Sequence, residues 1–308
     1  MADFGLLFPG QGAQKVGMGA ELYESSAAAK SIFERANEIL DFDLKQLCFE
    51  GPQEELNKTN ISQPAILVTS LAALEALKET GKLNWASCKA SAGLSLGEYT
   101  ALAAVGAIAY EDAISLVHKR GTFMQQACDA QPGGMASIVG MNREELGAIC
   151  EAATSAGVIC MANFNSPQQI AIAGELSALE AACAAAKEAG ARVFPLQVAG
   201  AFHSKLMSPA AAKLAPHLQE LNISEPEVPV IANVTGRQVT QAGDIRECLL
   251  KQVDSPALWV DCVQTVIGSG VTQFLEVGPG KVLAGLMRRI DRTASVTCIG
   301  TPADIENL

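Results

Sequence analysis

One break in the sequence pattern, Gln131-Pro132-Gly133-Gly134, separates two kinds of fold within this chain. Before the break, and again from about residue 201, apolar strand-like segments alternate with helical segments. That alternation is typical of a mainly parallel sheet with helices on both faces. Residues 135–198 instead follow the order strand, helix, strand, strand, helix, strand, which is typical of a ferredoxin-like unit. We therefore predict an α/β protein with a small unit inserted into a larger one.

The predicted boundaries follow from this pattern. Residues 1–128 and 201–308 form a discontinuous large α/β domain, and residues 129–200 form the inserted small domain. In the large domain, strands are predicted at 4–8, 228–233 and 272–277, and helices at 27–40, 63–78, 96–105, 110–127 and 281–290. In the small domain, strands are predicted at 135–139, 158–163, 169–173 and 192–198, and helices at 143–156 and 176–189.

Composition excludes several classes of protein. The 308 residues carry a formal net charge of −11, which disfavours general binding to nucleic acid. No apolar run approaches the ~20 residues that a membrane-spanning helix needs. The nine cysteines are scattered, without C-x-x-C spacing, and indicate reduced thiols. We expect a cytoplasmic protein, or one from a plastid or mitochondrion if a transit peptide has been removed.

Residues 93–97, Gly-Leu-Ser-Leu-Gly, fit the G-x-S-x-G pattern, in which a tight turn lifts a serine from a strand end onto a helix start. Ser95 is therefore a candidate nucleophile, and the N-terminus of the new helix would lie beside its hydroxyl. The alternative is a buried serine at a tight helix start with no catalytic role.

A serine hydroxyl needs a base, and the chain offers three histidines. His118 is predicted on the solvated side of a helix, and His217 on a helix surface or edge. His203 lies in a loop before the helix that starts at Ser208-Pro209, and it is the best candidate, the alternative being an exposed loop histidine. No acid that would orient its ring is evident, although three carboxyl groups are possible: Asp254, Asp261 and Glu276.

Arg120 narrows the choice of substrate. It lies near the middle of the apolar stripe of its helix, so its guanidinium is predicted to point inward. A buried arginine must be paired, ordinarily with an internal Asp or Glu. Beside an acyl-serine, however, it would receive a substrate carboxylate and favour dicarboxylic acyl groups.

The glycine-rich loops at residues 9–12 and 278–280 complete no nucleotide-binding motif. The sequence also shows no cluster of metal-ligand spacing, so we expect neither a metal nor a bound cofactor.

The chain resembles the malonyl-CoA:acyl carrier protein transacylases and the related acyltransferase domains of fatty-acid and polyketide synthases. The resemblance covers nearly the whole chain, and the segments that carry it are Phe8-Pro9-Gly10-Gln11-Gly12-Ala13-Gln14, residues 93–99, Arg120-Gly121, Asn163-Phe164-Asn165-Ser166-Pro167, residues 200–204, and residues 276–283. It implies a hydrolase-like large domain carrying a ferredoxin-like insertion, with the active site between them.

The same resemblance implies roles for single residues. Ser95 would be the nucleophile and His203 its base, and the main-chain carbonyl of Gln252 would orient His203. The backbone N–H groups of Gln11 and Leu96 would form the oxyanion hole. Arg120 would hold the malonyl carboxylate, and the sequence Ala201-Phe202-His203 is the form associated with malonyl rather than methylmalonyl selection. The chain departs from common family patterns at two positions, Leu94 and Leu258.

These roles imply transfer of a malonyl group from malonyl-CoA to the phosphopantetheine thiol of acyl carrier protein, through a malonyl-serine intermediate, by a monomer. Two alternatives are a serine thioesterase or esterase that uses the same Ser95 and His203, and a catalytically silent module that recruits the carrier; the presence of Ser95, His203 and Arg120 together argues against the silent module. An acyl carrier protein is acidic, so docking needs a local basic patch on this acidic chain. Two clusters are candidates: Lys281, Arg288 and Arg289, and Lys187, Arg192 and Lys205.

Overall fold

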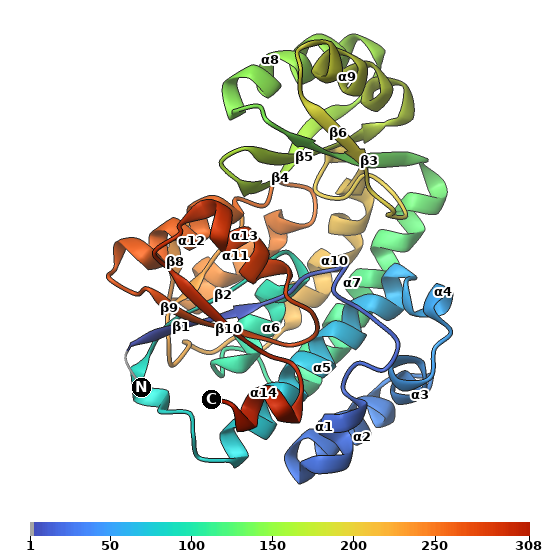
Figure 1. Ribbon diagram of the computed structural model, residues 1–308. Coiled ribbons are helices and arrows are strands. Elements are labelled where there is room, and N and C mark those ends of the chain that lie inside the picture. Colours follow the sequence, from blue (N-terminus) through green and yellow to red (C-terminus); the bar gives the residue numbers. More distant parts are fainter. Residues whose placement is uncertain (1–2) are drawn as a thin grey trace.

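The computed structural model describes residues 3–308 and contains two sheets, one above the other in Figure 1. The larger sheet consists of β1 (Phe4–Phe8), β2 (Cys88–Gly93), β7 (Val230–Ile231), β8 (Gln238–Val239), β9 (Gln273–Val277) and β10 (Ser295–Ile299). The smaller sheet consists of β3 (Gly133–Val139), β4 (Ile159–Ser166), β5 (Gln169–Glu175) and β6 (Arg192–Pro195).

The helices surround both sheets. They are α1 (Ala20–Ser25), α2 (Ala27–Ile39), α3 (Leu44–Phe49), α4 (Gln53–Leu56), α5 (Thr59–Glu79), α6 (Leu96–Ala104), α7 (Tyr110–Ala130), α8 (Arg143–Ala153), α9 (Leu176–Glu188), α10 (Ser208–Glu220), α11 (Ala242–Gln252), α12 (Trp259–Gly268), α13 (Val282–Ile290) and α14 (Pro302–Glu306). Short 3-10 turns lie at Trp85–Ser87, Thr154–Ala156 and Lys205–Met207.

The strands of the larger sheet run in the order β10-β9-β1-β2-β7-β8. All neighbours are parallel except β8, which pairs antiparallel with β7 at one edge. The carboxyl ends of β1, β2, β7 and β9 therefore meet along one edge of the sheet. Ligand sites in parallel α/β sheets form at this edge.

Helices cover the two faces of the larger sheet, as the alternation within β1 shows. Phe4, Leu6 and Phe8 belong to the main core, which contains the buried α5 and α6. Leu7 points to the opposite face, into a second core that includes Trp259 of α12. The predicted two-sided sheet is therefore present.

The smaller sheet is antiparallel, with strand order β4-β5-β3-β6. One face packs on α8 and α9 through a separate apolar core, which includes Ile138, Ile172 and Ala182. Its other face contributes Met135 and Ala173 to the main core. Figure 1 shows this sheet and its two helices as a layer above the larger sheet, reached by the long α7.

Most predicted elements are found, but some strands differ. The predicted strand at 228–233 is only two residues long, and the one at 192–198 ends at Pro195. β8 and β10 were not predicted. Only Ile299 of β10 is buried, and Ser295 and Thr297 are exposed, so this edge strand has no clear apolar pattern.

Two further observations concern membrane-spanning helices and the cysteines. None of the helices in residues 3–308 is long and apolar enough to cross a membrane. All nine cysteines are free, and six of them are buried. Burial raises the pKa of several of these thiols, among them Cys48, to about 12, and Cys160, to about 11.

Candidate active site

Ser95 stands between the end of β2 and the start of α6, at the carboxyl edge of the larger sheet. Its backbone has φ 54° and ψ −104°, a conformation that costs energy for a residue with a side chain. The side-chain oxygen of Asn233, which follows β7, accepts the Ser95 backbone N–H at 2.7 Å. The Asn233 amide also donates to the Gly93 carbonyl at 2.8 Å. Asn233, two residues beyond the neighbouring strand β7, thus holds the turn in its strained form.

Glycine is required on both sides of this turn. A Cβ atom at Gly93 would lie 1.9 Å from the carbonyl oxygen of Gly97, and one at Gly97 would lie 2.1 Å from that of Phe8. Both neighbours are backbone and cannot move aside alone. The two glycines of G-x-S-x-G therefore let β1, the turn and α6 approach closely enough to present Ser95.

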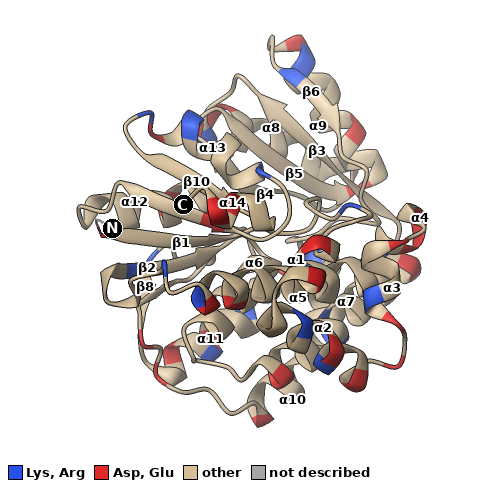
Figure 2. Ribbon diagram, turned by 60° about the horizontal axis from the view of Figure 1, so that its bottom comes forward, with Lys and Arg blue, Asp and Glu red and all other residues tan. Residues whose placement is uncertain are grey.

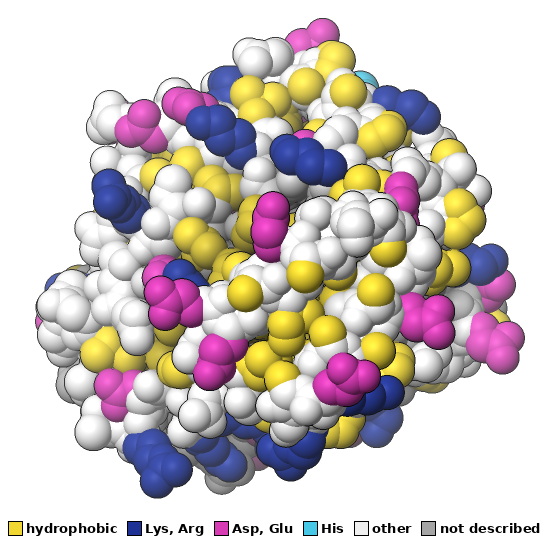
Figure 3. Space-filling view, turned by 90° about the horizontal axis from the view of Figure 1, so that it is seen from above, with side chains coloured by type: hydrophobic (Ala, Val, Ile, Leu, Met, Phe, Trp, Pro, Cys, Tyr) yellow, Lys and Arg dark blue, Asp and Glu magenta, His cyan; other side chains and the backbone are white. Residues whose placement is uncertain are grey.

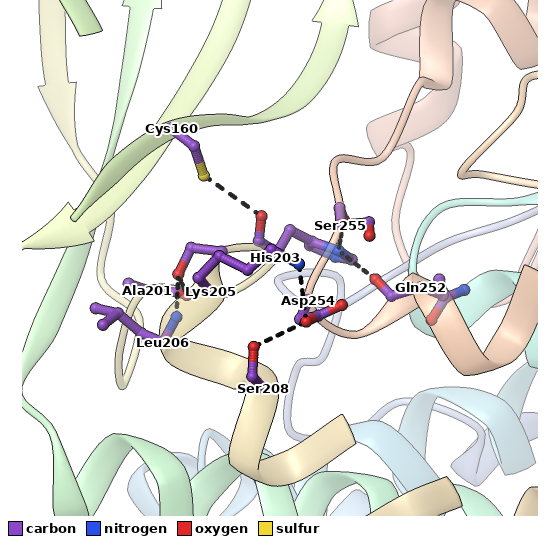
Figure 4. Close-up of polar contacts among 10 residues, drawn as sticks. Cys160, Ala201, His203, Lys205, Leu206, Ser208, Gln252, Asp254 and Ser255 are labelled. Carbon is purple, nitrogen blue, oxygen red and sulfur yellow. Dashed lines mark hydrogen bonds and ion pairs between the residues drawn. The ribbon is translucent and has the colours of Figure 1, made fainter. Parts of the chain in front are cut away.

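His203 faces Ser95 although the two residues are 108 positions apart. Its Nε2 lies 2.7 Å from Ser95 Oγ, and its Nδ1 lies 3.1 Å and 3.0 Å from the carbonyl oxygens of Gln252 and Ser255. Figure 4 shows the ring directed at these two carbonyls. Because carbonyl oxygens only accept, they select the tautomer with hydrogen on Nδ1 and leave Nε2 free to take the serine proton.

The position of His203 differs from that of an exposed loop residue. Its side chain is buried, with 3% exposed, and its φ is 58°. Burial, together with the nearby charge of Arg120, lowers the pKa of His203 to about 4, although the two carbonyls act in the opposite direction. The imidazole is therefore neutral at pH 7, as a base must be.

The three carboxyl groups considered as orienting acids lie elsewhere. Asp254 accepts from Lys205 and Ser208, a contact visible in Figure 4. Asp261 pairs with Arg143. Glu276 accepts the backbone N–H groups at the start of α13. The carbonyls of Gln252 and Ser255 occupy the place that an acid holds in other serine sites.

The other two histidines contact aromatic rings. His118 is half-buried and meets Phe42 edge to face, and His217 stacks on Phe123. His118 is thus less solvated than its place on the helix predicted.

Arg120 is buried, with 1% exposed, and points inward as predicted. Its guanidinium does not pair with a carboxylate: Nη1 donates to Gln63 Oε1 at 2.6 Å, and Nη2 donates to Gln252 Oε1 at 3.0 Å and to Ser95 Oγ at 3.1 Å. The ring of Tyr99 lies 5.2 Å from the guanidinium carbon. Arg120 Nε has no hydrogen-bond partner among residues 3–308. The guanidinium therefore keeps both charge and donor capacity for an anion beside Ser95.

A cavity of about 370 Å³ opens over Ser95 and His203. It is lined by the loop after β1, including Gln11, and by residues of the small sheet, such as Asn163 and Ala171. Leu94, one of the two departures from common family patterns, also lines it. Leu96 is the first residue of α6, so its N–H has no acceptor within the helix. Gln11, in the loop after β1, thus lines the same cavity as Ser95, and Leu96 follows Ser95 directly at the start of α6.

Comparisons with known proteins agree on one family. The acyl transferase domain family matches residues 6–301. The chain belongs to this family. The malonyl CoA-acyl carrier protein transacylase of Bacillus subtilis (strain 168) is 45% identical over 308 residues, covering 99% of this chain and 96% of that protein. The enzyme of the same name from Escherichia coli (strain K12) is 42% identical over 304 residues, covering 98% and 97%.

Solved structures of the acyl transferase family have the same fold. The malonyl CoA-acyl carrier protein transacylase of Clostridium perfringens has a TM-score of 0.94 at 41% identity, covering 99% of this chain and 96% of that one. A malonyl-transacylase in complex with its holo type II PKS acyl-carrier protein also has a TM-score of 0.94, at 39% identity, covering 99% and 98%.

Three polar side chains in this acyl transferase site were not singled out from the sequence. They are Gln63, Glu98 and Asn233, which contact Arg120, Gln252 and Ser95. Gln63 could have been noticed as the amide that directly precedes the apolar run at residues 64–68 of α5. Asn233 could have been noticed because it follows a strand of the parallel sheet, where site residues gather.

Proposed function

We propose that this protein transfers a malonyl group from malonyl-CoA to the phosphopantetheine thiol of acyl carrier protein, by way of an ester on Ser95. The observation that carries the proposal is the contact of Ser95 Oγ with two groups at once: His203 Nε2 at 2.7 Å and Arg120 Nη2 at 3.1 Å. The first contact activates the hydroxyl, and the second places a cation where the free carboxylate of a malonyl ester would lie.

The first half-reaction forms the ester. His203 Nε2 takes the Ser95 proton as Oγ attacks the thioester carbonyl, and the N–H groups of Gln11 and Leu96 stabilise the oxyanion. The C–S bond then breaks, and the coenzyme sulfur leaves with the proton from His203. The second half-reaction is the reverse with another thiol: His203 takes the thiol proton, the sulfur attacks the ester, and Ser95 Oγ leaves with that proton. Serine, imidazole and backbone groups suffice, so we propose no metal or bound cofactor.

The domain architecture, the origin of the site residues in one chain and the free thiols are consistent with this proposal. The strand orders support a hydrolase-like large domain, residues 1–128 and 201–308, and a ferredoxin-like insertion, residues 129–200. All the proposed site residues come from one chain, so a monomer would be sufficient. The free thiols favour a reducing compartment such as the cytoplasm.

The direct test is mass spectrometry of the protein after incubation with malonyl-CoA alone. We expect a malonyl adduct on the tryptic peptide that contains Ser95, because no acceptor thiol is present to remove the group. Adding holo acyl carrier protein should discharge the adduct into the carrier. An unmodified Ser95 peptide under turnover conditions would refute the covalent route, and rapid loss of the adduct to water without the carrier would favour an esterase.

We further propose that the carrier docks on an arginine-lined groove. This groove, of about 760 Å³, brings together Arg288 and Arg289 of α13, Arg192 of β6, and Arg292. Exposed Phe194 also lines it, and the groove shares Gln169 and Leu196 with the catalytic cavity. It thus takes members from both basic clusters considered above. Figure 2 shows basic residues on α13, whereas Figure 3 shows mixed charges over the small unit seen from above.

The docking proposal predicts a defect that is specific to the carrier. In Arg288→Glu/Arg289→Glu, the KM for holo carrier should rise at least ~10-fold, with a weaker dependence on salt, because attraction to an acidic partner becomes repulsion. Steady-state transfer at several ionic strengths measures this. The matched control is Lys187→Glu/Lys205→Glu, which reverses two charges outside the groove and should leave the KM for the carrier unchanged. Equal effects of both double variants would contradict docking at the groove.

A further inference from the structure

The proposed mechanism leaves one buried acid beside the site unused. Glu98 lies one turn into α6 from Ser95 and is only 2% exposed. Its Oε2 accepts from Gln252 Nε2 at 2.6 Å and from the Asn233 backbone N–H at 3.2 Å. A carboxyl group in such a place must be fully hydrogen-bonded or it destabilises the fold. Its two partners, Gln252 and Asn233, are the residues that contact the proposed machinery.

Gln252 can support Arg120 in only one orientation of its side-chain amide. As observed, Nε2 donates to Glu98 Oε2 and to the Ser95 carbonyl at 2.9 Å, and Oε1 accepts from Arg120 Nη2. A reversed amide would set its two N–H donors against the guanidinium, which only donates. Glu98, together with the Ser95 carbonyl, therefore supplies the acceptors that make the reversed amide unfavourable.

This arrangement also keeps a carboxylate away from Arg120. An acid in direct contact would form a bidentate pair and compete with a substrate carboxylate for the same donors. Here amide oxygens from Gln63 and Gln252 contact the guanidinium, and the acid lies behind Gln252. The cation is thus held in place but stays available.

We propose that Glu98 is a positioning residue for malonyl recognition: through the side chain of Gln252 it fixes the guanidinium of Arg120 beside Ser95. The inference rests on the proposed role of Arg120. The same oxygen also bonds Asn233, whose side chain holds the Ser95 backbone, so Glu98 links the nucleophile's turn to the cation.

This role requires a side chain at position 98 that is long enough to place an acceptor oxygen beside Gln252. It does not require a negative charge. Burial raises the pKa of Glu98 to about 7, while hydrogen bonds from Gln252 and Asn233 and the charge of Arg120 act to lower it. Neutral or ionised, the group still presents an acceptor oxygen to Gln252. A glutamine at this position keeps an acceptor at the same distance, whereas an aspartate keeps the charge but is one methylene too short.

The test compares Glu98→Asp with Glu98→Gln, using kcat and KM for malonyl-CoA and for acetyl-CoA. In Glu98→Asp the malonyl-to-acetyl ratio of kcat/KM should fall at least ~10-fold, mainly through a higher KM for malonyl-CoA, as for other residues that orient a binding group. Glu98→Gln should keep a ratio close to that of the unmodified protein. Loss in Glu98→Gln with retention in Glu98→Asp would show a charge-balancing role and overturn the proposal, as would retention in both.

Two further variants distinguish an error in the role of Glu98 from an error in the proposed role of Arg120. Glu276→Asp is the matched control, because Glu276 is also a fully buried glutamate but it caps α13; its ratio should be unchanged. Arg120→Met should abolish most of the malonyl preference. If Arg120→Met keeps the preference, the proposed role of Arg120 is wrong; if only Arg120→Met loses it, the role of Glu98 is wrong.

Discussion

Ser95→Ala is expected to lower the rate of malonyl transfer by about 10⁴-fold or more, because it removes the protein group that accepts the malonyl group in the first half-reaction. Arg120 and His203 remain, so binding of malonyl-CoA should persist. Transfer to holo carrier, followed by gel shift or by mass spectrometry of the carrier, measures the rate.

The fold of the variant is the control for this result. A serine at φ 54° gains nothing from its own side chain that stabilises the turn, so alanine should leave the melting temperature nearly unchanged. Transfer within a factor of about ten of the unmodified rate would be too fast for a lost nucleophile and would place the chemistry on another residue.

His203→Ala is expected to lower the rate by a similar factor, about 10⁴-fold or more, since serine and base act as a unit. The unmodified protein should also show a distinctive pH profile. With the pKa of His203 lowered to about 4, kcat/KM should hold steady as pH falls through 6.5 and decline only as the pH approaches 4.

The lowered pKa of His203 also makes the stability of the folded protein depend on pH. The pKa of the imidazole is near its ordinary value of 6.5 in the unfolded chain, whereas in the folded protein it is about 4. Between these values the unfolded state binds more protons, so this group's contribution to stability falls as the pH is lowered from 6.5 to about 4 and then levels off. His217→Ala is the control for both measurements, because His217 stacks on Phe123 away from Ser95, and it should leave the rate and the acid limb unchanged. An acid limb near 6.5 would contradict the buried, neutral imidazole.

The sequence predicted the individual strands, turns and helix faces of this site better than the hydrogen bonds between their side chains. Strand β1, the turn at Ser95 and the inward face of α7 each follow from a local pattern of small or apolar residues. The partner of Arg120 was predicted less well, because the ordinary expectation for a buried cation is an acid. Two amides from α5 and α11 take that place, and nothing local in either helix indicates that they meet.

The two main-chain carbonyls beside His203 show a second limit of predicting site residues from the sequence. Main-chain acceptors carry no signature in the sequence, so a search among Asp254, Asp261 and Glu276 had no means of finding them. The resemblance to a family supplied Gln252, and the geometry adds Ser255 beside it. The short strand β7 and the edge strand β10 were misjudged because their pairing is set by neighbours that are distant in the sequence.

The buried thiols have a consequence for an enzyme that handles thioesters. A cysteine attacks a thioester only as its thiolate, and Cys160, whose Sγ donates to the His203 carbonyl, has its pKa raised to about 11. At pH 7 only about one such group in 10⁴ is ionised. Such cysteines should therefore react very slowly with the thioester substrate. Acylation of the protein at these thiols should stay negligible while the acyl group is transferred from one thiol substrate to the other.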